Sequence, residues 1–252
     1  MRKPKRYGGL DTLRGITLIS MVVYHVCWDL VYIFRKDWDW YQGTGAYVWQ
    51  QSICWSFILL SGFCWSLGKR PLKRGLVVFG AGAVVSLVTL LFMPEDRVVF
   101  GVLTLTGSSM ICMAWLDKLC QRIPPLAGLA GAGLLFVITR SVNSGYLGFE
   151  GWNFFRLPEG LYRGYVMTFL GFAEPGFFST DYFSMVPWFF LFLSGYFIYR
   201  MIKDRRDFME KHLTGEWKPF SFLGRHSLII YMLHQPAAFG MLTLLDKMGL
   251  LF

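Results

Sequence analysis

Four ionisable side chains lie in one apolar stretch of the sequence, residues 8–34. They are Asp11, Arg14, His25 and Asp29. Residues 15–34 have about the length that an α-helix needs to cross a bilayer. A charge near the bilayer centre costs at least ~2.5 kcal/mol on insertion scales, so ionisable groups at that depth indicate function. These four residues are therefore the first candidates for a catalytic site.

The spacing of the four residues favours chemistry at His25. Arg14 and His25 are 11 positions apart, which places them on nearly one helix face and ~16 Å apart along the axis. His25 and Asp29 are four positions apart, so we expect the carboxylate to hydrogen-bond the imidazole and fix its tautomer. This arrangement predicts that His25 transfers a proton or acts as a nucleophile.

A second polar group lies near the other end of the chain: Arg225, His226, His234 and Gln235. We expect this segment to enter the membrane from the same side as the first, with His234 about two turns deeper than His226. The two segments would then line one cavity, where arginines bind an anionic ligand and a histidine transfers protons. The alternative is that these side chains only hydrogen-bond between helices. No metal site is expected, since no span has the HxxH or HExxH spacing.

The composition indicates an integral membrane protein. Of the 252 residues, 54% are hydrophobic and only 16% are charged, whereas soluble domains average about 25% charged. The net charge of +9 is attributed to basic cytosolic loops and not to nucleic-acid binding. The five cysteines are scattered and lack metal-ligand spacing, so they are interpreted as small core residues. We expect one domain, 1–252, without a cleavable signal.

The pattern predicts an all-α polytopic bundle of about seven transmembrane helices. The expected spans are 15–34, 46–68, 75–93, 98–116, 125–140, 182–202 and 220–245, the last one kinked at Pro236. Residues 141–181 are expected to be irregular, with an extra re-entrant or half helix near 155–175. The segments on the N-terminal side of the membrane hold most of the 25 Lys and Arg residues, so the N-terminus is predicted to be cytosolic.

Several motifs resemble known acyltransferases. They are LDTLRGI at 10–16, MVVYH at 21–25 followed by Asp29, FILLSGF at 57–63, FGVL at 100–103, STDYFSMVPW at 179–188 and FLGRHSLIIYMLHQP at 222–236. The first helix is similar to that of the transmembrane acyltransferase superfamily. The chain more closely resembles small bacterial proteins grouped with the catalytic domain of heparan-alpha-glucosaminide N-acetyltransferase. The spacing of Arg14 and His25 also resembles the motif of acyltransferase family three.

The resemblance implies transfer of an acyl group, most often acetyl, from cytosolic acyl-coenzyme A to a sugar-like or glycan acceptor at the outer side of a bacterial inner membrane. It implies that His25 is the catalytic residue and Arg14 its motif partner, and it leaves a homodimer open. Coenzyme A carries phosphates, for which the candidate ligands are Arg14, Arg225, His226, Lys69, Arg70 and Arg74. The candidates for acceptor binding are His234, Gln235, Asp181 and Trp188.

Two departures separate this chain from the family pattern. Thr104 stands where related sequences often have histidine, and residues 35–37 lack the catalytic histidine of the sugar acetyltransferase branch. The identity of the acceptor therefore cannot be inferred from that branch of the family. Two other functions are considered: a transporter or flippase that uses the same buried groups, and a non-enzymatic membrane scaffold. Binding of coenzyme A distinguishes the enzyme from both.

Overall fold

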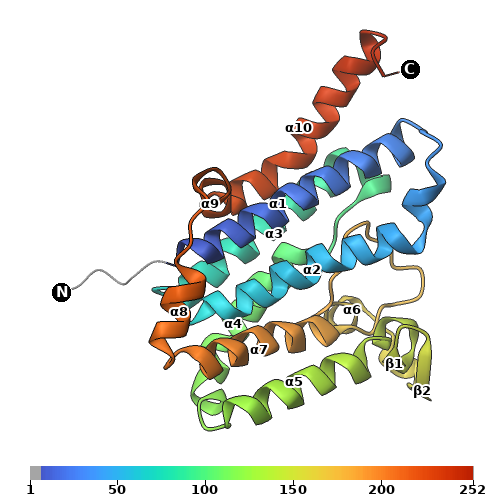
Figure 1. Ribbon diagram of the computed structural model, residues 1–252. Coiled ribbons are helices and arrows are strands. Elements are labelled where there is room, and N and C mark those ends of the chain that lie inside the picture. Colours follow the sequence, from blue (N-terminus) through green and yellow to red (C-terminus); the bar gives the residue numbers. More distant parts are fainter. Residues whose placement is uncertain (1–6, 252) are drawn as a thin grey trace. The chain divides into compact units, whose positions relative to one another are not determined.

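The structure is a computed structural model that describes residues 7–251 and is mostly helical (Figure 1). The basic residues Arg2, Lys3, Lys5 and Arg6, which contributed to the predicted orientation, lie outside the described residues. In chain order the elements are α1 (Gly8–Trp28), α2 (Thr44–Trp65), α3 (Pro71–Phe92), α4 (Val102–Cys120), α5 (Pro125–Thr139), β1 (Tyr146–Phe149), β2 (Trp152–Arg156), α6 (Tyr165–Leu170), α7 (Met185–Ile202), α8 (Arg206–Leu213), α9 (Lys218–Arg225) and α10 (Ser227–Lys247).

The chain divides into two compact units. Unit 1 combines the segment up to Phe57 with the segment from Arg205 on, so it holds α1, the first half of α2, and α8 to α10. Unit 2 comprises Ile58–Asp204. All the polar residues singled out near the two ends of the sequence fall in unit 1.

Within residues 7–251, five helical segments are long and apolar enough to cross a membrane. They are Gly8–Ile33, Pro71–Phe92, Pro125–Ser144, Met185–Ile202 and Ser227–Lys247. The prediction of a multi-pass membrane protein is thus confirmed. α2 and α4, with 22 and 19 residues, are not among the five. The count of seven spans and the cytosolic N-terminus therefore stay predictions.

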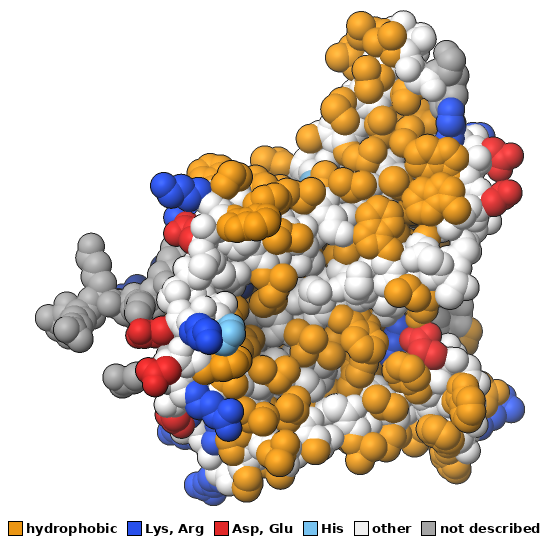
Figure 2. Space-filling model, viewed as in Figure 1, with side chains coloured by type: hydrophobic (Ala, Val, Ile, Leu, Met, Phe, Trp, Pro, Cys, Tyr) orange, Lys and Arg blue, Asp and Glu red, His pale blue; other side chains and the backbone are white. Residues whose placement is uncertain are grey.

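The outer surfaces of these helices are apolar. In α3, for example, Leu87, Leu91 and Phe92 are 58%, 67% and 77% exposed. Figure 2 shows hydrophobic side chains covering much of the visible surface, including α10. Exposed hydrophobic surface on this scale is unfavourable in water and indicates contact with lipid.

The prediction of an all-α fold is wrong in one place. The region that was expected to be irregular contains an antiparallel hairpin of β1 and β2, in which Tyr146 pairs with Arg156 and Phe149 with Trp152. Glu150 and Gly151 form its turn with φ of 46° and 93°, and glycine adopts such angles without steric cost. The extra helix expected near 155–175 exists only as the six-residue α6, which is too short to enter a membrane as a half span.

Two helix boundaries differ from those predicted. α1 begins at Gly8, earlier than expected, and continues past Trp28 as a π-helical turn, Asp29–Ile33. The predicted last span is interrupted at His226, which separates α9 from α10, whereas α10 runs on through Pro236. The His226 ring nitrogen Nδ1 lies 2.9 Å from the carbonyl oxygen of Phe222. The same carbonyl also accepts the backbone N–H of His226, so the side chain adds a second contact at the end of α9.

In unit 2, α3 packs antiparallel to α4, and α7 packs on both α4 and α5. The guanidinium of Arg200 near the end of α7 donates hydrogen bonds to the carbonyl oxygens of Cys120, Gln121 and Ile123. Arg200 thus satisfies carbonyls at the C-terminal end of α4 that have no partner within the helix.

Candidate functional site

The first helix and the last two helices of unit 1 run parallel and in contact. Gly15 of α1 faces Gly224 of α9 so closely that a Cβ on either glycine would overlap a backbone carbonyl of the other helix. Farther along, the His25 ring packs on that of His234 in α10. Small residues at a crossing permit this close approach of two backbones. The parallel packing brings the predicted residues of the two chain ends into two clusters.

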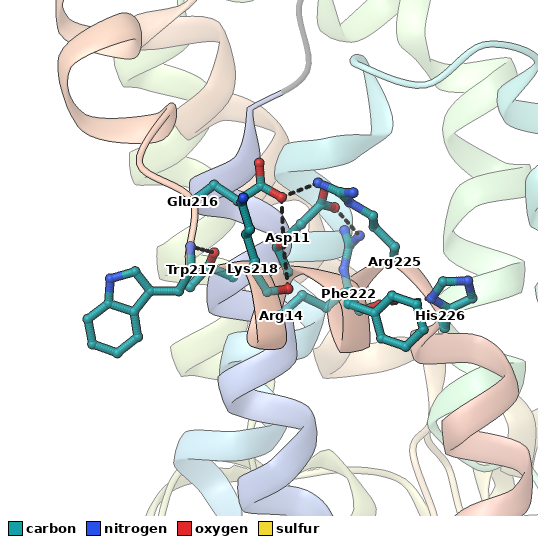
Figure 3. A network of polar contacts seen from close by, with 10 residues as sticks. Asp11, Arg14, Glu216, Trp217, Lys218, Phe222, Arg225 and His226 are labelled. Carbon is teal, nitrogen blue, oxygen red and sulfur yellow. Dashed lines mark hydrogen bonds and ion pairs between the residues drawn. The ribbon is translucent and has the colours of Figure 1, made fainter.

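The first cluster, called here the arginine cluster, consists of Asp11, Arg14, Glu216, Arg225 and His226 (Figure 3). Nε of Arg225 lies 3.5 Å from Oδ2 of Asp11, and Nη1 of Arg14 lies 3.9 Å from Oδ1 of the same carboxylate. Arg225 also forms an ion pair with Glu216. Each arginine therefore already has a carboxylate partner, an arrangement that the sequence pattern did not predict.

Glu216 is the member of this cluster that the sequence analysis missed. Ser221 donates a 2.6 Å hydrogen bond to its Oε1. This bond, together with the charge of Arg225, lowers the pKa of the Glu216 carboxyl. Glu216 lies in the connection between α8 and α9, 205 positions after Asp11, so its place in the cluster depends on the fold and not on local spacing.

The lowered pKa of Glu216 predicts a pH-dependent contribution to stability. Folding favours the charged form of this carboxyl. Its contribution to the free energy of unfolding is therefore complete above the ordinary glutamate pKa, and it disappears as the pH falls through the lower pKa of the folded state. We expect Glu216→Gln to lower the melting temperature at neutral pH, and the difference from the wild type to vanish in acid. Thermal unfolding of both proteins in detergent over this pH range measures the effect.

The matched control for this prediction is Glu95→Gln, at an exposed position of unit 2. It should leave the pH profile unchanged. A Glu216→Gln profile parallel to that of the wild type down to the lowest pH would contradict the expected contribution.

The second cluster, called here the histidine cluster, consists of His25, Asp29, His234 and Gln235. The ring centroids of His25 and His234 are 4.8 Å apart and the planes are tilted by 59°. Nδ1 of His234 lies 2.5 Å from the carbonyl oxygen of Tyr231. By helix geometry this cluster lies ~16 Å along α1 from Arg14.

Asp29 is fully buried, and it has a partner that the sequence analysis did not expect. Its Oδ1 accepts a hydrogen bond of 2.5 Å from Nε2 of Gln235. The i, i+4 spacing predicted His25 as a partner of this carboxylate, and that contact stays a prediction; the amide reaches the carboxylate from the neighbouring helix. Asp29 therefore links α1 to α10, and the ring of His25 meets that of His234.

Aromatic rings extend from the histidine cluster to the surface of unit 1. The Tyr24 ring contacts His25 edge-on at 6.1 Å and contacts Trp49 at 5.2 Å. Trp49 in turn stacks with Trp40 at 6.5 Å, and Trp40 is 52% exposed. These rings were not predicted as part of the site, although the density of aromatic residues between 38 and 49 is a signal that could have found them.

Three of the predicted phosphate ligands lie in unit 2, on the connection between α2 and α3. Lys69 and Arg70 are exposed, and the guanidinium of Arg74 covers Gly68. Arg14, Arg225 and His226 all belong to the arginine cluster of unit 1. The predicted set is therefore divided between two parts of the fold.

The two acceptor ligands predicted in unit 2 have structural partners. Oδ2 of Asp181 accepts a hydrogen bond from the backbone N–H of Val102, which caps the start of α4. Trp188 is only 4% exposed, and its ring packs against Phe136 and beneath the guanidinium of Arg140. A ring buried in this way cannot stack on a sugar, so we do not carry these two residues into the proposed site.

Thr104, where related sequences often have histidine, is buried between α3 and α4. It packs against Gly82. Within residues 7–251, no three His, Cys, Asp or Glu side chains gather as ligands for a metal ion.

Comparison with known proteins identifies the family. The family model for the catalytic domain of heparan-alpha-glucosaminide N-acetyltransferase matches residues 6–236. The chain belongs to this family. No curated protein and no solved structure matches the chain. The match to the heparan-alpha-glucosaminide N-acetyltransferase family includes both clusters, and membership implies an acyltransferase in the membrane.

Proposed function

We propose that this protein transfers an acyl group, with acetyl as the expected group, from acyl-coenzyme A to a sugar-like or glycan acceptor across the membrane. The observation that carries the proposal is the ring contact of His25 with His234, next to a fully buried carboxylate. Buried ionisable groups in a membrane helix are costly, and catalysis accounts for keeping them. Family membership favours the enzyme over a transporter or flippase.

The arginine cluster is the proposed binding site for the phosphates of coenzyme A. Arg14 and Arg225 offer planar donor groups that suit phosphate oxygens. The thioester then has to reach ~16 Å along α1 to His25, a distance that the extended pantetheine arm can span. His25 acts there either as a base that deprotonates the acceptor or by carrying the acyl group itself.

The end of the protein that holds the arginine cluster is proposed to face the cytosol. Over the sequence, the segments predicted on the same side of the membrane as the N-terminal end of α1 hold most of the 25 Lys and Arg residues, and such asymmetry favours placing that side inside. The acceptor then approaches from the outer side, along the aromatic rings that lead from Trp40 to His25.

Acetyl-coenzyme A is expected to stabilise the purified protein against heat. A ligand present at 100 times its dissociation constant adds ~2.7 kcal/mol to the native state. Arg225→Ala should weaken binding about tenfold, because one charged phosphate contact is lost. Glu216→Gln should instead tighten binding a few-fold, because this carboxylate competes with phosphate for Arg225.

The matched control is Arg163→Ala, an exposed arginine in unit 2. It should leave the apparent affinity unchanged. No stabilisation of the wild type by any acyl-coenzyme A would refute the proposed donor. Equal affinities for Arg225→Ala and the wild type would remove the arginine cluster as its binding site.

A further inference from the structure

Two buried atoms of the histidine cluster have no hydrogen-bond partner among the described residues: Nε2 of His234 and Oε1 of Gln235. Buried polar atoms nearly always have a partner, so such exceptions require an explanation. The two residues are adjacent on α10, at the place where α10 contacts His25 and Asp29. Two neighbouring acceptor or donor atoms at this position are available to hydrogen-bond a ligand.

The neighbouring hydrogen bonds define the chemical character of both atoms. Nδ1 of His234 faces the carbonyl oxygen of Tyr231, which can only accept. In the neutral ring the proton is therefore on Nδ1, and Nε2 presents a lone pair. The amide nitrogen of Gln235 donates to the carboxylate of Asp29. The other polar atom of that amide is Oε1, which can only accept a hydrogen bond. Both unpartnered atoms are thus hydrogen-bond acceptors.

Two adjacent acceptors require a ligand that presents donors. The thioester of acyl-coenzyme A has no N–H or O–H at its reacting centre and cannot satisfy them. An amine or hydroxyl nucleophile can. We propose that His234 and Gln235 form the subsite for the acceptor's nucleophilic group, and that Nε2 of His234 is the base that takes its proton. This inference rests on the proposed acyltransferase function and assigns different tasks to the two histidines.

The proton and bond balance of this step is simple. The nitrogen or oxygen of the acceptor bonds to the acyl carbon while its proton passes to Nε2 of His234. The bond between the acyl carbon and its leaving group breaks. The leaving group is the sulfur of coenzyme A in direct transfer, or the ring nitrogen of His25 if that residue carries the acyl group. His234 then returns the proton to the leaving group, so no other reactant is needed.

Two substitutions at one position separate the base from a purely structural histidine. His234→Asn retains an amide N–H near the place of Nδ1, so the hydrogen bond to Tyr231 can persist, but nothing replaces Nε2. His234→Gln places an amide group near the position of Nε2, which can hold the acceptor but cannot take its proton. The matched control is His212→Gln, an exposed histidine on α8.

The assay measures acetyl transfer from acetyl-coenzyme A to glucosamine and to hydroxylamine, together with thermal stabilisation by acetyl-coenzyme A. We expect His234→Gln to lower kcat by at least ~100-fold with KM for the nucleophile changed less than about threefold. His234→Asn should lose kcat to a similar degree and raise KM as well. Added imidazole should partly restore the activity of His234→Ala. Stabilisation by acetyl-coenzyme A should persist in all three variants.

The outcomes distinguish this inference from the function on which it rests. Wild-type rates in both His234→Gln and His234→Asn would overturn the inference and leave the acyltransferase intact. Loss of stabilisation by acetyl-coenzyme A in these variants would also overturn it, since His234 would then serve the donor or the fold. A wild-type protein that neither binds acetyl-coenzyme A nor transfers acetyl to either probe would refute the proposed function itself.

Discussion

His25→Ala is expected to reduce acetyl transfer by ~10²–10⁴-fold, the range typical for removal of a general base or acid. The imidazole lies in the last turn of α1, against the ring of His234. Alanine at this position can neither take up a proton nor carry the acyl group. Binding of acetyl-coenzyme A should survive, because the arginine cluster lies about three helical turns away. The measurement is the rate of acetyl transfer to glucosamine beside the thermal stabilisation by acetyl-coenzyme A.

His212→Ala is the control for this prediction, since it removes an exposed histidine outside both clusters. If His25 carries the acyl group, mass spectrometry of the wild type incubated with acetyl-coenzyme A should also detect an acetyl adduct that His25→Ala lacks. Transfer by His25→Ala at the wild-type rate would remove this residue from the mechanism, whatever the fate of the adduct.

Gly15→Ala is expected to destabilise the protein by roughly 1–3 kcal/mol, the usual cost of inserting a carbon atom into a tightly packed contact. A Cβ at this position would overlap the carbonyl of Phe220, so α9 would have to move away from α1. Gly224→Ala should have a similar effect from the other helix. Thermal or denaturant unfolding in detergent measures both variants.

Gly240→Ala is the matched control, because it lies in α10 and no neighbouring atom lies within 4 Å of the place that a Cβ would take. Alanine there should be neutral or slightly stabilising, since glycine is a poor helix former. The double variant of Gly15 and Gly224 should lose less stability than the two single losses added together, because one displacement of the helices relieves both overlaps. Unchanged stability in Gly15→Ala would show that the contact is not tight.

Much of the site could be predicted from local sequence. The depth of His25 and its spacing from Arg14 follow from helix geometry alone, and the motif at 222–236 predicted that a second arginine and histidine lie on a partner helix. In the structure the two arginines, Arg14 and Arg225, share the carboxylate of Asp11, and the rings of His25 and His234 are in contact. The resemblance to the family was likewise visible in the motifs and is confirmed by the match over residues 6–236.

The sequence could not predict which distant residues become the hydrogen-bond and ion-pair partners of the site residues. Asp29 accepts from Gln235 on another helix, 206 positions away, and local spacing does not indicate such a partner. Glu216 enters the arginine cluster from the connection between α8 and α9, which packs on Gly8 and Gly9 at the start of α1. Trp188 was predicted to bind the acceptor, but it is only 4% exposed, and such burial cannot be read from local sequence.

The prediction of secondary structure was wrong at two places, the hairpin and the end of α9, because neither has a strong local signal. The hairpin at 146–156 is short, and its turn depends on the backbone angles of Glu150 and Gly151 more than on any apolar alternation. The interruption at His226 was hidden because a proline ten positions later offered a more familiar cause for a kink.

The hydrogen bond between Asp29 and Gln235 also bears on how the protein is made. Its two residues are 206 positions apart. At roughly 5–20 residues per second, the ribosome needs about 10–40 s to produce the second partner after the first. During that interval the buried carboxylate of α1 has to remain in the membrane without the amide that later holds it. A chain released before α10 lacks His234 and Gln235 and cannot form the histidine cluster, so assembly of that cluster has to follow synthesis of α10.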